Sequence, residues 1–145
     1  MPGYWLLKTE PGEYSYADLE RDRRAEWDGV SNPVAQRNLR SMAIGDVCVV
    51  YHTGDERRAV GLARVVRAGY PDPSDASGKR VLVDVAPDGQ LGRPVGLAEI
   101  KGMPVFADSP LVRIGRLSVV PLTAEQFAAL QRAASRPGAP PLAPS

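Results

Sequence analysis

Two largely apolar runs, 47–53 and 60–66, are joined by the polar turn 54–58. Their length and their content of β-branched residues are typical of strands. Because apolar residues occupy both alternating positions of each run, both faces of these strands must be covered by other parts of the chain. The pattern therefore predicts a hairpin buried in a closed or covered sheet, and it favours a small barrel over an open sheet with one wet face.

Shorter strand and helix signals flank this hairpin. Strands are predicted at 4–9, 80–86 and 117–120, and one helical turn is predicted at 97–101. Three further helices are marked by N-capping residues, and they should run from 16 to 23, from 33 to 42 and from 124 to 134. The caps are Ser15 with Asp18, Asn32 before Pro33, and Thr123 with Gln126.

These elements amount to five or more strands with three or four short helices. They do not alternate as strand and long helix, which argues against a doubly wound parallel sheet. The expected fold is α+β and mainly β: a small β-barrel of five or more strands with short helices packed at its side, and with Trp5 and Val49 inside. A length of 145 residues leaves room for one domain, expected at 1–134, and the proline- and alanine-rich segment 135–145 is expected to be a tail.

Charge and cysteine content exclude several classes of protein. The 18 basic residues nearly balance the 17 acidic ones, so no strong global field attracts polyanions. A single cysteine, Cys48, excludes a disulfide framework and a multi-cysteine zinc site. No apolar run approaches the roughly 20 residues that cross a membrane. The first residues carry no secretory signal, so the cytoplasm is the expected location.

Catalytic signatures are also missing. The single histidine, His52, and Cys48 belong to one predicted strand, where four residues separate them by roughly 13 Å, too far for a nucleophile–base pair. No glycine-rich phosphate loop and no HExxH pattern occurs. The sequence therefore predicts a protein that is not an enzyme and that has neither a cofactor nor a metal site.

Several short motifs occur in one order along nearly the whole chain. They are Trp5-Leu6-Leu7-Lys8-Thr9-Glu10-Pro11, Trp27-Asp28-Gly29-Val30 with Asn32 and Ala35, Met42 with Gly45-Asp46, Tyr51-His52, Asp72-Pro73, and Arg116-Leu117-Ser118-Val119. In this set the chain resembles the EVE family of the PUA-like superfamily. Two positions depart from the family pattern: Ser31 stands where arginine is more usual, and Thr53 stands where serine is usual.

The resemblance implies a PUA-like barrel and a kinship with YTH domains, which bind methylated adenine in RNA. EVE domains are associated with reading modified cytosines in DNA, or with RNA, and are not established enzymes. By this resemblance the base-binding residues should lie in the motifs above. They are Lys8, Thr9, Glu10, Trp27, Asp28, Gly29, Val30, Asn32, Tyr51, His52, Arg116, Leu117 and Ser118.

The residues themselves give a second, weaker argument for a base pocket. A flipped base needs an aromatic face and polar partners for its edge. Trp27, in a polar glycine-containing segment, can provide the face, although a core tryptophan is the alternative. Glu10 can accept from an exocyclic amine, or it is simply a solvated acid. Lys8 is either a pocket cation or a lysine whose stem lies along the core and whose amine reaches solvent.

Other polar residues have ordinary structural alternatives. Arg116 can meet a phosphate or form a surface ion pair, and His52 is more often a hydrogen-bonded structural residue than a ligand. A cluster of arginines could face phosphates, but neighbouring acids dilute it, so a solvated face is the better reading. Its members are Arg21, Arg23, Arg24, Arg37 and Arg40, with the acids Glu20, Asp22 and Glu26 between them.

The sequence thus favours a non-catalytic nucleic-acid-binding module that reads a modified base, a modified cytosine in DNA or a modified base in RNA, in an aromatic-walled pocket. A sensor of a free nucleobase or nucleoside is a second hypothesis. A nucleic-acid-processing enzyme is a third, with Lys8, Glu10 and His52 as acid–base groups. Nothing in the sequence separates the first hypothesis from the second, or defines the oligomeric state.

Overall fold

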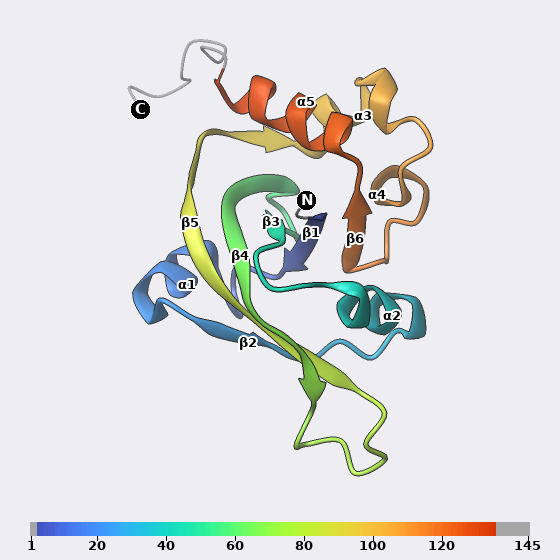
Figure 1. The fold of residues 1–145 in the computed structure, drawn as a ribbon. Coiled ribbons are helices and arrows are strands. Elements are labelled where there is room, and N and C mark those ends of the chain that lie inside the picture. Colours follow the sequence, from blue (N-terminus) through green and yellow to red (C-terminus); the bar gives the residue numbers. More distant parts are fainter. Residues whose placement is uncertain (1–2, 136–145) are drawn as a thin grey trace.

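The structure is a computed structural model that describes residues 3–135. Its centre is a six-stranded mixed sheet in the order β2-β5-β4-β3-β1-β6 (Figure 1). β1 and β3 are parallel, and every other neighbouring pair is antiparallel. The strands are β1 (Tyr4–Thr9), β2 (Ala25–Trp27), β3 (Val47–His52), β4 (Arg58–Pro71), β5 (Val81–Gly96) and β6 (Val119–Leu122).

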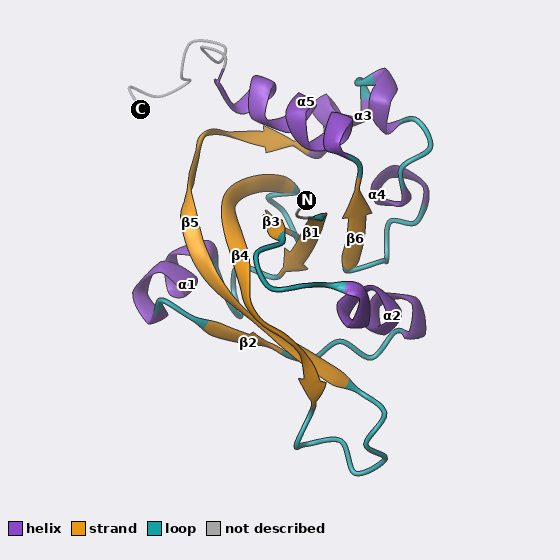
Figure 2. Ribbon diagram, in the orientation of Figure 1, coloured by secondary structure: helices purple, strands orange, loops and turns teal. Residues whose placement is uncertain are grey.

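The sheet is strongly curved, and short helices pack around it (Figures 1 and 2). Four register shifts between β4 and β5 and one between β3 and β4 allow these long strands to bend. β2 and β6 stay at the two edges, so the sheet is not closed. The helices are α1 (Tyr16–Asp22), α2 (Pro33–Ser41), α3 (Leu97–Lys101), η1 (Pro104–Phe106), α4 (Pro110–Arg113) and α5 (Ala124–Ser135).

The α+β, mainly β architecture is confirmed, with the hairpin β3–β4 in the middle of the sheet. All six residues of β3 are buried, as expected for a strand without a wet face. Val49 is only 1% exposed, whereas Trp5 is partly buried against the core. The polar edge of Trp5 explains this position, because its indole N–H donates to Asp46 Oδ2 at 2.9 Å.

The helix starts follow the capping residues. The Ser15 hydroxyl accepts from the Asp18 backbone N–H, and the Asp18 carboxylate accepts from the Ser15 N–H. Asn32 Oδ1 accepts from the N–H groups of Val34 and Ala35 at the start of α2. Thr123 and Gln126 form the same reciprocal pair before α5. Local side-chain chemistry therefore sets three helix starts.

Strand lengths and the position of Trp27 differ from the sequence prediction. β4 and β5 run well beyond 60–66 and 80–86, because each provides the backbone partner of the other from Arg58↔Gly96 to Pro71↔Val81. β5 can contain prolines and glycines because its pairing with β4 is irregular, with several register shifts. Trp27, expected in a loop, ends the short edge strand β2 and pairs with Val83. β6 begins two residues later than predicted.

At the C-terminal end, α5 extends to Ser135. The rest of the predicted tail, 136–145, lies outside the described residues. Between residues 3 and 135, no helix has both the length and the apolar character needed to cross a membrane.

Candidate functional site

A cavity of about 600 Å³ lies where the end of β1, the loop that follows it and the segment from β2 to Val30 meet. Its volume is within the range of small-molecule sites. The lining residues come from five separate stretches of the chain. They are Lys8, Thr9, Glu10, Glu13, Tyr14, Asp22, Arg24, Ala25, Glu26, Trp27, Asp28, Gly29, Val30 and Ser118.

Eight of the thirteen predicted base-binding residues line this cavity. They are Lys8, Thr9, Glu10, Trp27, Asp28, Gly29, Val30 and Ser118. The other five, Asn32, Tyr51, His52, Arg116 and Leu117, lie outside the lining. The structure thus brings together residues that are up to 110 positions apart in sequence. Their role in base binding stays a prediction.

Lys8 lies at the wall nearest to β6. Its backbone N–H donates to the Ser118 carbonyl at 2.9 Å, which fixes the strand end against the turn before β6. Its ammonium donates to the Gly115 carbonyl at 2.8 Å and lies 5.8 Å from the centre of the Tyr51 ring. Burial lowers the pKa of the Lys8 amine from its usual 10.5. Two N–H groups of the ammonium remain beyond the bond to Gly115 and can serve a ligand.

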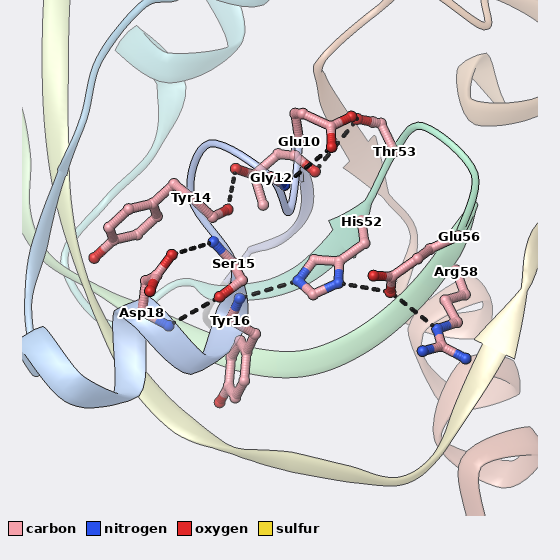
Figure 3. Close-up of polar contacts among 11 residues, drawn as sticks. Glu10, Gly12, Tyr14, Ser15, Tyr16, Asp18, His52, Thr53, Glu56 and Arg58 are labelled. Atoms are coloured by element: carbon pink, nitrogen blue, oxygen red, sulfur yellow. Dashed lines mark hydrogen bonds and ion pairs between the residues drawn. The ribbon is translucent and has the colours of Figure 1, made fainter.

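Glu10 follows β1 and is exposed, with its side chain held in place (Figure 3). Its Oε1 accepts from the Gly12 backbone N–H at 3.0 Å, and its Oε2 accepts from the Thr53 hydroxyl at 3.4 Å. A Cβ on Gly54 would lie 2.6 Å from Oε2, so only glycine leaves room for this carboxylate. Because a carboxylate has about four acceptor positions, Glu10 can still accept from a ligand.

Trp27 forms the aromatic wall. Its side chain is only 7% exposed, so the same residue belongs to the core cluster and lines the cavity. Asp28 and Gly29 beside it are exposed, and Gly29 has a φ of 74°, a conformation that favours glycine. The Val30 carbonyl accepts from Gln36 Nε2 of α2 at 2.7 Å, which fixes the far end of this wall.

His52 does not line the cavity, but its hydrogen bonds fix a neighbouring segment of the chain. Its Nε2 accepts from the Tyr16 backbone N–H at 3.0 Å, so in the neutral ring Nδ1 carries the proton that it donates to Glu56 Oε1 at 2.9 Å (Figure 3). Both ring nitrogens are therefore bonded within the protein. The contact with Tyr16 fixes the start of α1, next to the loop that carries Glu13 and Tyr14.

The remaining predicted residues have structural positions. Asn32 is the N-cap of α2, and its side-chain oxygen is already shared by two backbone N–H groups. Tyr51 and Leu117 are 3% exposed core residues. Arg116 is exposed on the turn between α4 and β6, two residues before Ser118.

The cavity is lined by more acids than bases, which the sequence did not predict. Five acidic side chains face only two basic ones, Lys8 and Arg24. Arg24 is itself paired with Asp84 at 2.8 Å. The acids are Glu10, Glu13, Asp22, Glu26 and Asp28.

Two tyrosine hydroxyls hold two of these acids, Asp22 and Glu26, in place. The Tyr14 hydroxyl donates to Asp22 Oδ2 at 3.0 Å; burial, followed by this hydrogen bond, raises the Tyr14 pKa to about 12, so the hydroxyl stays a donor at neutral pH. The Tyr70 hydroxyl contacts Glu26 at 3.0 Å and also Asp84. These residues belong to none of the family motifs, and only the pairing of β5 with both β2 and β4 brings Tyr70 near Glu26.

A known protein family matches nearly the whole of the chain that carries this cavity. The family model described as "EVE domain" matches residues 3–133. The chain belongs to the EVE domain family. The match covers the elements from β1 to α5 except the last two residues of α5, so this EVE domain is nearly the whole of the described fold.

Known relatives share both sequence and fold with this EVE domain. Thymocyte nuclear protein 1 of mouse is 32% identical over 162 aligned positions, which cover 88% of this chain and 71% of the mouse protein. A protein from Rhodopseudomonas palustris, solved by NMR, is 39% identical with a TM-score of 0.85, over 90% of this chain and 91% of its own.

A third relative was solved with a ligand. The human THYN1 protein in complex with 5-methylcytosine-containing DNA is 29% identical to this EVE domain. Its TM-score is 0.84, and the alignment covers 92% of this chain and 98% of the human one. The family and this complex point to a binding domain rather than a catalytic one.

Proposed function

We propose that this EVE domain binds DNA that carries a modified cytosine, with 5-methylcytosine as the first candidate, and holds the flipped base in the cavity. The observation that carries the proposal is the convergence of Trp27 with Lys8, Glu10 and Ser118 on one 600 Å³ cavity. The similarity to a human protein solved with 5-methylcytosine-containing DNA supports this choice of ligand.

The lining suits a cytosine. Trp27 offers a face on which a base can stack, and the carboxylates can accept from the exocyclic amine, the donor that cytosine has and thymine lacks. The Lys8 ammonium can donate to a base carbonyl. Because the lining is mainly acidic, a phosphate is repelled from it. The cavity therefore favours a neutral base over the sugar–phosphate backbone.

The free energy of burying a methyl group limits the expected selectivity for 5-methylcytosine over cytosine. Burying one additional methyl group contributes about 0.8 kcal/mol, which is only a several-fold change in affinity. Larger discrimination needs a steric or polar penalty against the unmodified base. We therefore expect this EVE domain to prefer 5-methylcytosine over cytosine by less than about tenfold.

Two side chains with the potential for catalysis, Cys48 and His52, support a binding role. Burial raises the pKa of the Cys48 thiol far above its usual value, so it stays protonated and is a poor nucleophile. The two nitrogens of His52 are bonded to Tyr16 and Glu56, which leaves neither free to act on a substrate. The proposed function includes no chemical step.

The test compares four ligands of one sequence context: a DNA oligonucleotide with a single 5-methylcytosine, the unmodified DNA, the corresponding methylated RNA, and free 5-methylcytidine. We expect the methylated DNA to bind most tightly and to be recovered intact. Equal or tighter binding of the free nucleoside would favour the sensor hypothesis, and tighter binding of the RNA would favour an RNA reader. Cleavage or base release would show an enzyme.

A further inference from the structure

The arginines near the cavity fall into two groups. Arg21 pairs with Asp18 and Asp22, and Arg24 pairs with Asp84, so these two arginines beside the acidic lining are neutralised locally. Arg37 and Arg40 lie on α2 and are exposed, and neither has an ion pair with another described residue. The arginines that look like one diluted cluster in the sequence are therefore separated in space.

Gln36 of α2 links the cavity wall to the start of β5. Its Nε2 donates to the Val30 carbonyl at 2.7 Å and to the Val81 carbonyl at 3.3 Å, and its Oε1 accepts from the Val81 N–H at 2.9 Å. Arg37 follows Gln36, and Arg80 precedes Val81. Two cations thus flank the buried glutamine that holds the Trp27–Val30 wall.

Arg40 and Lys79 extend this arrangement. The Arg40 guanidinium donates to the Lys79 carbonyl, and the backbone of Arg40 lies against Gly69 of β4. The loop itself is well organised, because the Asp75 carboxylate accepts from the backbone N–H groups of Lys79 and Arg80. We call Arg37, Arg40, Lys79 and Arg80 the basic corner. All four are exposed, and none pairs with an acid between residues 3 and 135.

We propose that the basic corner binds the phosphates of the DNA strand next to the base held in the cavity. This inference rests on the proposed function. The acidic lining repels phosphates, and the chain's net charge of +1 provides no global attraction, so a bound strand needs a local cationic surface. Arginines and lysines without protein partners can neutralise phosphates and release counterions. The shared contact through Gln36 places this surface beside the cavity wall.

The test is the double variant Arg37→Ala/Arg80→Ala, measured against the control Lys101→Ala/Arg132→Ala. The control pair is also exposed and forms no ion pair with a described residue. It lies on α3 and α5, at the end of the molecule opposite to the β4–β5 loop (Figure 1). Both variants remove two positive charges, so any effect of net charge is matched.

Affinity for the methylated and unmodified DNA is measured by titration at several salt concentrations. In the Arg37→Ala/Arg80→Ala variant, the slope of log affinity against log salt should become shallower by about one for each phosphate that the protein no longer neutralises. The preference for 5-methylcytosine should stay as in the parent, and the control should keep the parent slope. A variant with the parent slope, or a control that changes equally, would refute the phosphate surface.

Failure of the two proposals can be told apart. A parent chain that binds DNA with a salt dependence but without preference for 5-methylcytosine contradicts the proposed function alone, and the slope of the double variant still decides the basic corner. A parent that binds no DNA at low salt overturns both. If the double variant keeps both the preference for 5-methylcytosine and the parent's salt dependence, the proposed base site stands and the proposed phosphate surface is refuted.

Discussion

At the scale of single residues, Trp27 combines two roles that the sequence presents as alternatives. A core tryptophan and a pocket tryptophan look the same in a sequence, because the sequence does not show what the ring packs against. In the structure the side chain is 7% exposed and still lines the cavity. A stacking surface that is also packed in the core loses little conformational freedom when a ligand binds, which favours affinity.

Replacing Trp27 with alanine should remove this stacking surface and weaken binding of the methylated DNA by about 1–3 kcal/mol. The loss should be the same at low and high salt, because stacking releases no counterions. Titration at two salt concentrations checks this, with folding followed by thermal melting. Since Trp27 is also a core residue, Trp27→Phe is the more conservative second variant and should retain much of the affinity. A folded Trp27→Ala protein that binds as tightly as the parent would contradict the stacking site.

Gly54 offers a way to move Glu10 without changing it. A Cβ at Gly54 would lie 2.6 Å from Glu10 Oε2, so Gly54→Ala must displace that carboxylate. Gly45→Ala is the matched control: its φ is also positive, at 92° against 70°, and nothing lies within 4 Å of the place that a Cβ would take there. Both variants should lose about 1 kcal/mol of stability from the strained backbone.

Only Gly54→Ala should weaken binding of the methylated DNA, by about 1 kcal/mol or more, if Glu10 accepts from the base amine. Calorimetric titration of the two variants provides the comparison. Equal affinities for DNA in Gly54→Ala, Gly45→Ala and the parent would show that Glu10 has no part in recognition.

At the scale of elements, local chemistry explains which parts of the fold could be predicted. The capping groups around Ser15 and Asn32 act over three or four residues, so the sequence shows them directly. The length of β5 depends instead on what β4 offers across the sheet. β2 is a strand only because Val83 and Val85 of β5 provide its partners. Such contacts leave no signal within a short window of sequence.

The position of α1 depends on contacts between residues that are far apart in the sequence. The Tyr16 N–H donates to His52, its hydroxyl donates to the Leu62 carbonyl at 2.6 Å, and its ring lies where a Cβ of Gly61 would be. These contacts join α1 to β3 and β4. The loop between Glu10 and α1, which forms one side of the cavity, is therefore fixed from the sheet.

His52→Ala should leave the Tyr16 N–H without a buried partner and lower the free energy of unfolding by about 1–3 kcal/mol. Hydrogen exchange of the Tyr16 amide should accelerate, and binding of methylated DNA should weaken because the cavity wall loosens. Glu56→Gln, which still offers an oxygen to Nδ1–H, should change each of these much less. Unchanged exchange at Tyr16 in the His52→Ala protein would contradict the supporting role.

At the scale of the whole molecule, charge is arranged in a way that composition hides. The formal net charge of the chain is only +1. Nevertheless, the charged residues of the cavity lining are mainly acids. The basic corner consists of cations that form no ion pair with an acid among residues 3–135. The family motifs identified the Trp27 and Lys8–Glu10 sides of the cavity. Glu13, Tyr14 and Glu26 lie outside those motifs, and the bond between Gln36 of α2 and Val81, the residue after Arg80, forms only in the folded chain. The sequence therefore predicted the motif residues of the cavity better than the other lining residues and the basic corner.

Asp46 connects the N-terminal segment to the centre of the sheet, so its ionisation should influence the stability of the whole molecule. Its Oδ1 accepts from the Gly3 N–H at 2.8 Å, and its Oδ2 accepts from Ala43 N–H and the Trp5 indole, each at 2.9 Å. Burial alone would raise the Asp46 pKa, but these hydrogen bonds hold it below its usual 3.8. The folded state therefore binds this proton less readily than the unfolded chain does.

A depressed folded-state pKa contributes stability above the unfolded pKa, about 4, and this contribution is lost as the pH falls through the lower folded value. Asp46→Asn should lower the free energy of unfolding at pH 7 by about 1–3 kcal/mol, because the new amide presents N–H groups to existing donors. The variant no longer titrates at this position, so it should lose less stability than the parent between pH 7 and pH 3. Urea unfolding at both pH values measures this, with Asp55→Asn in the exposed turn as the control. An Asp46→Asn protein that loses as much stability on acidification as the parent would exclude Asp46 as a source of the acid sensitivity.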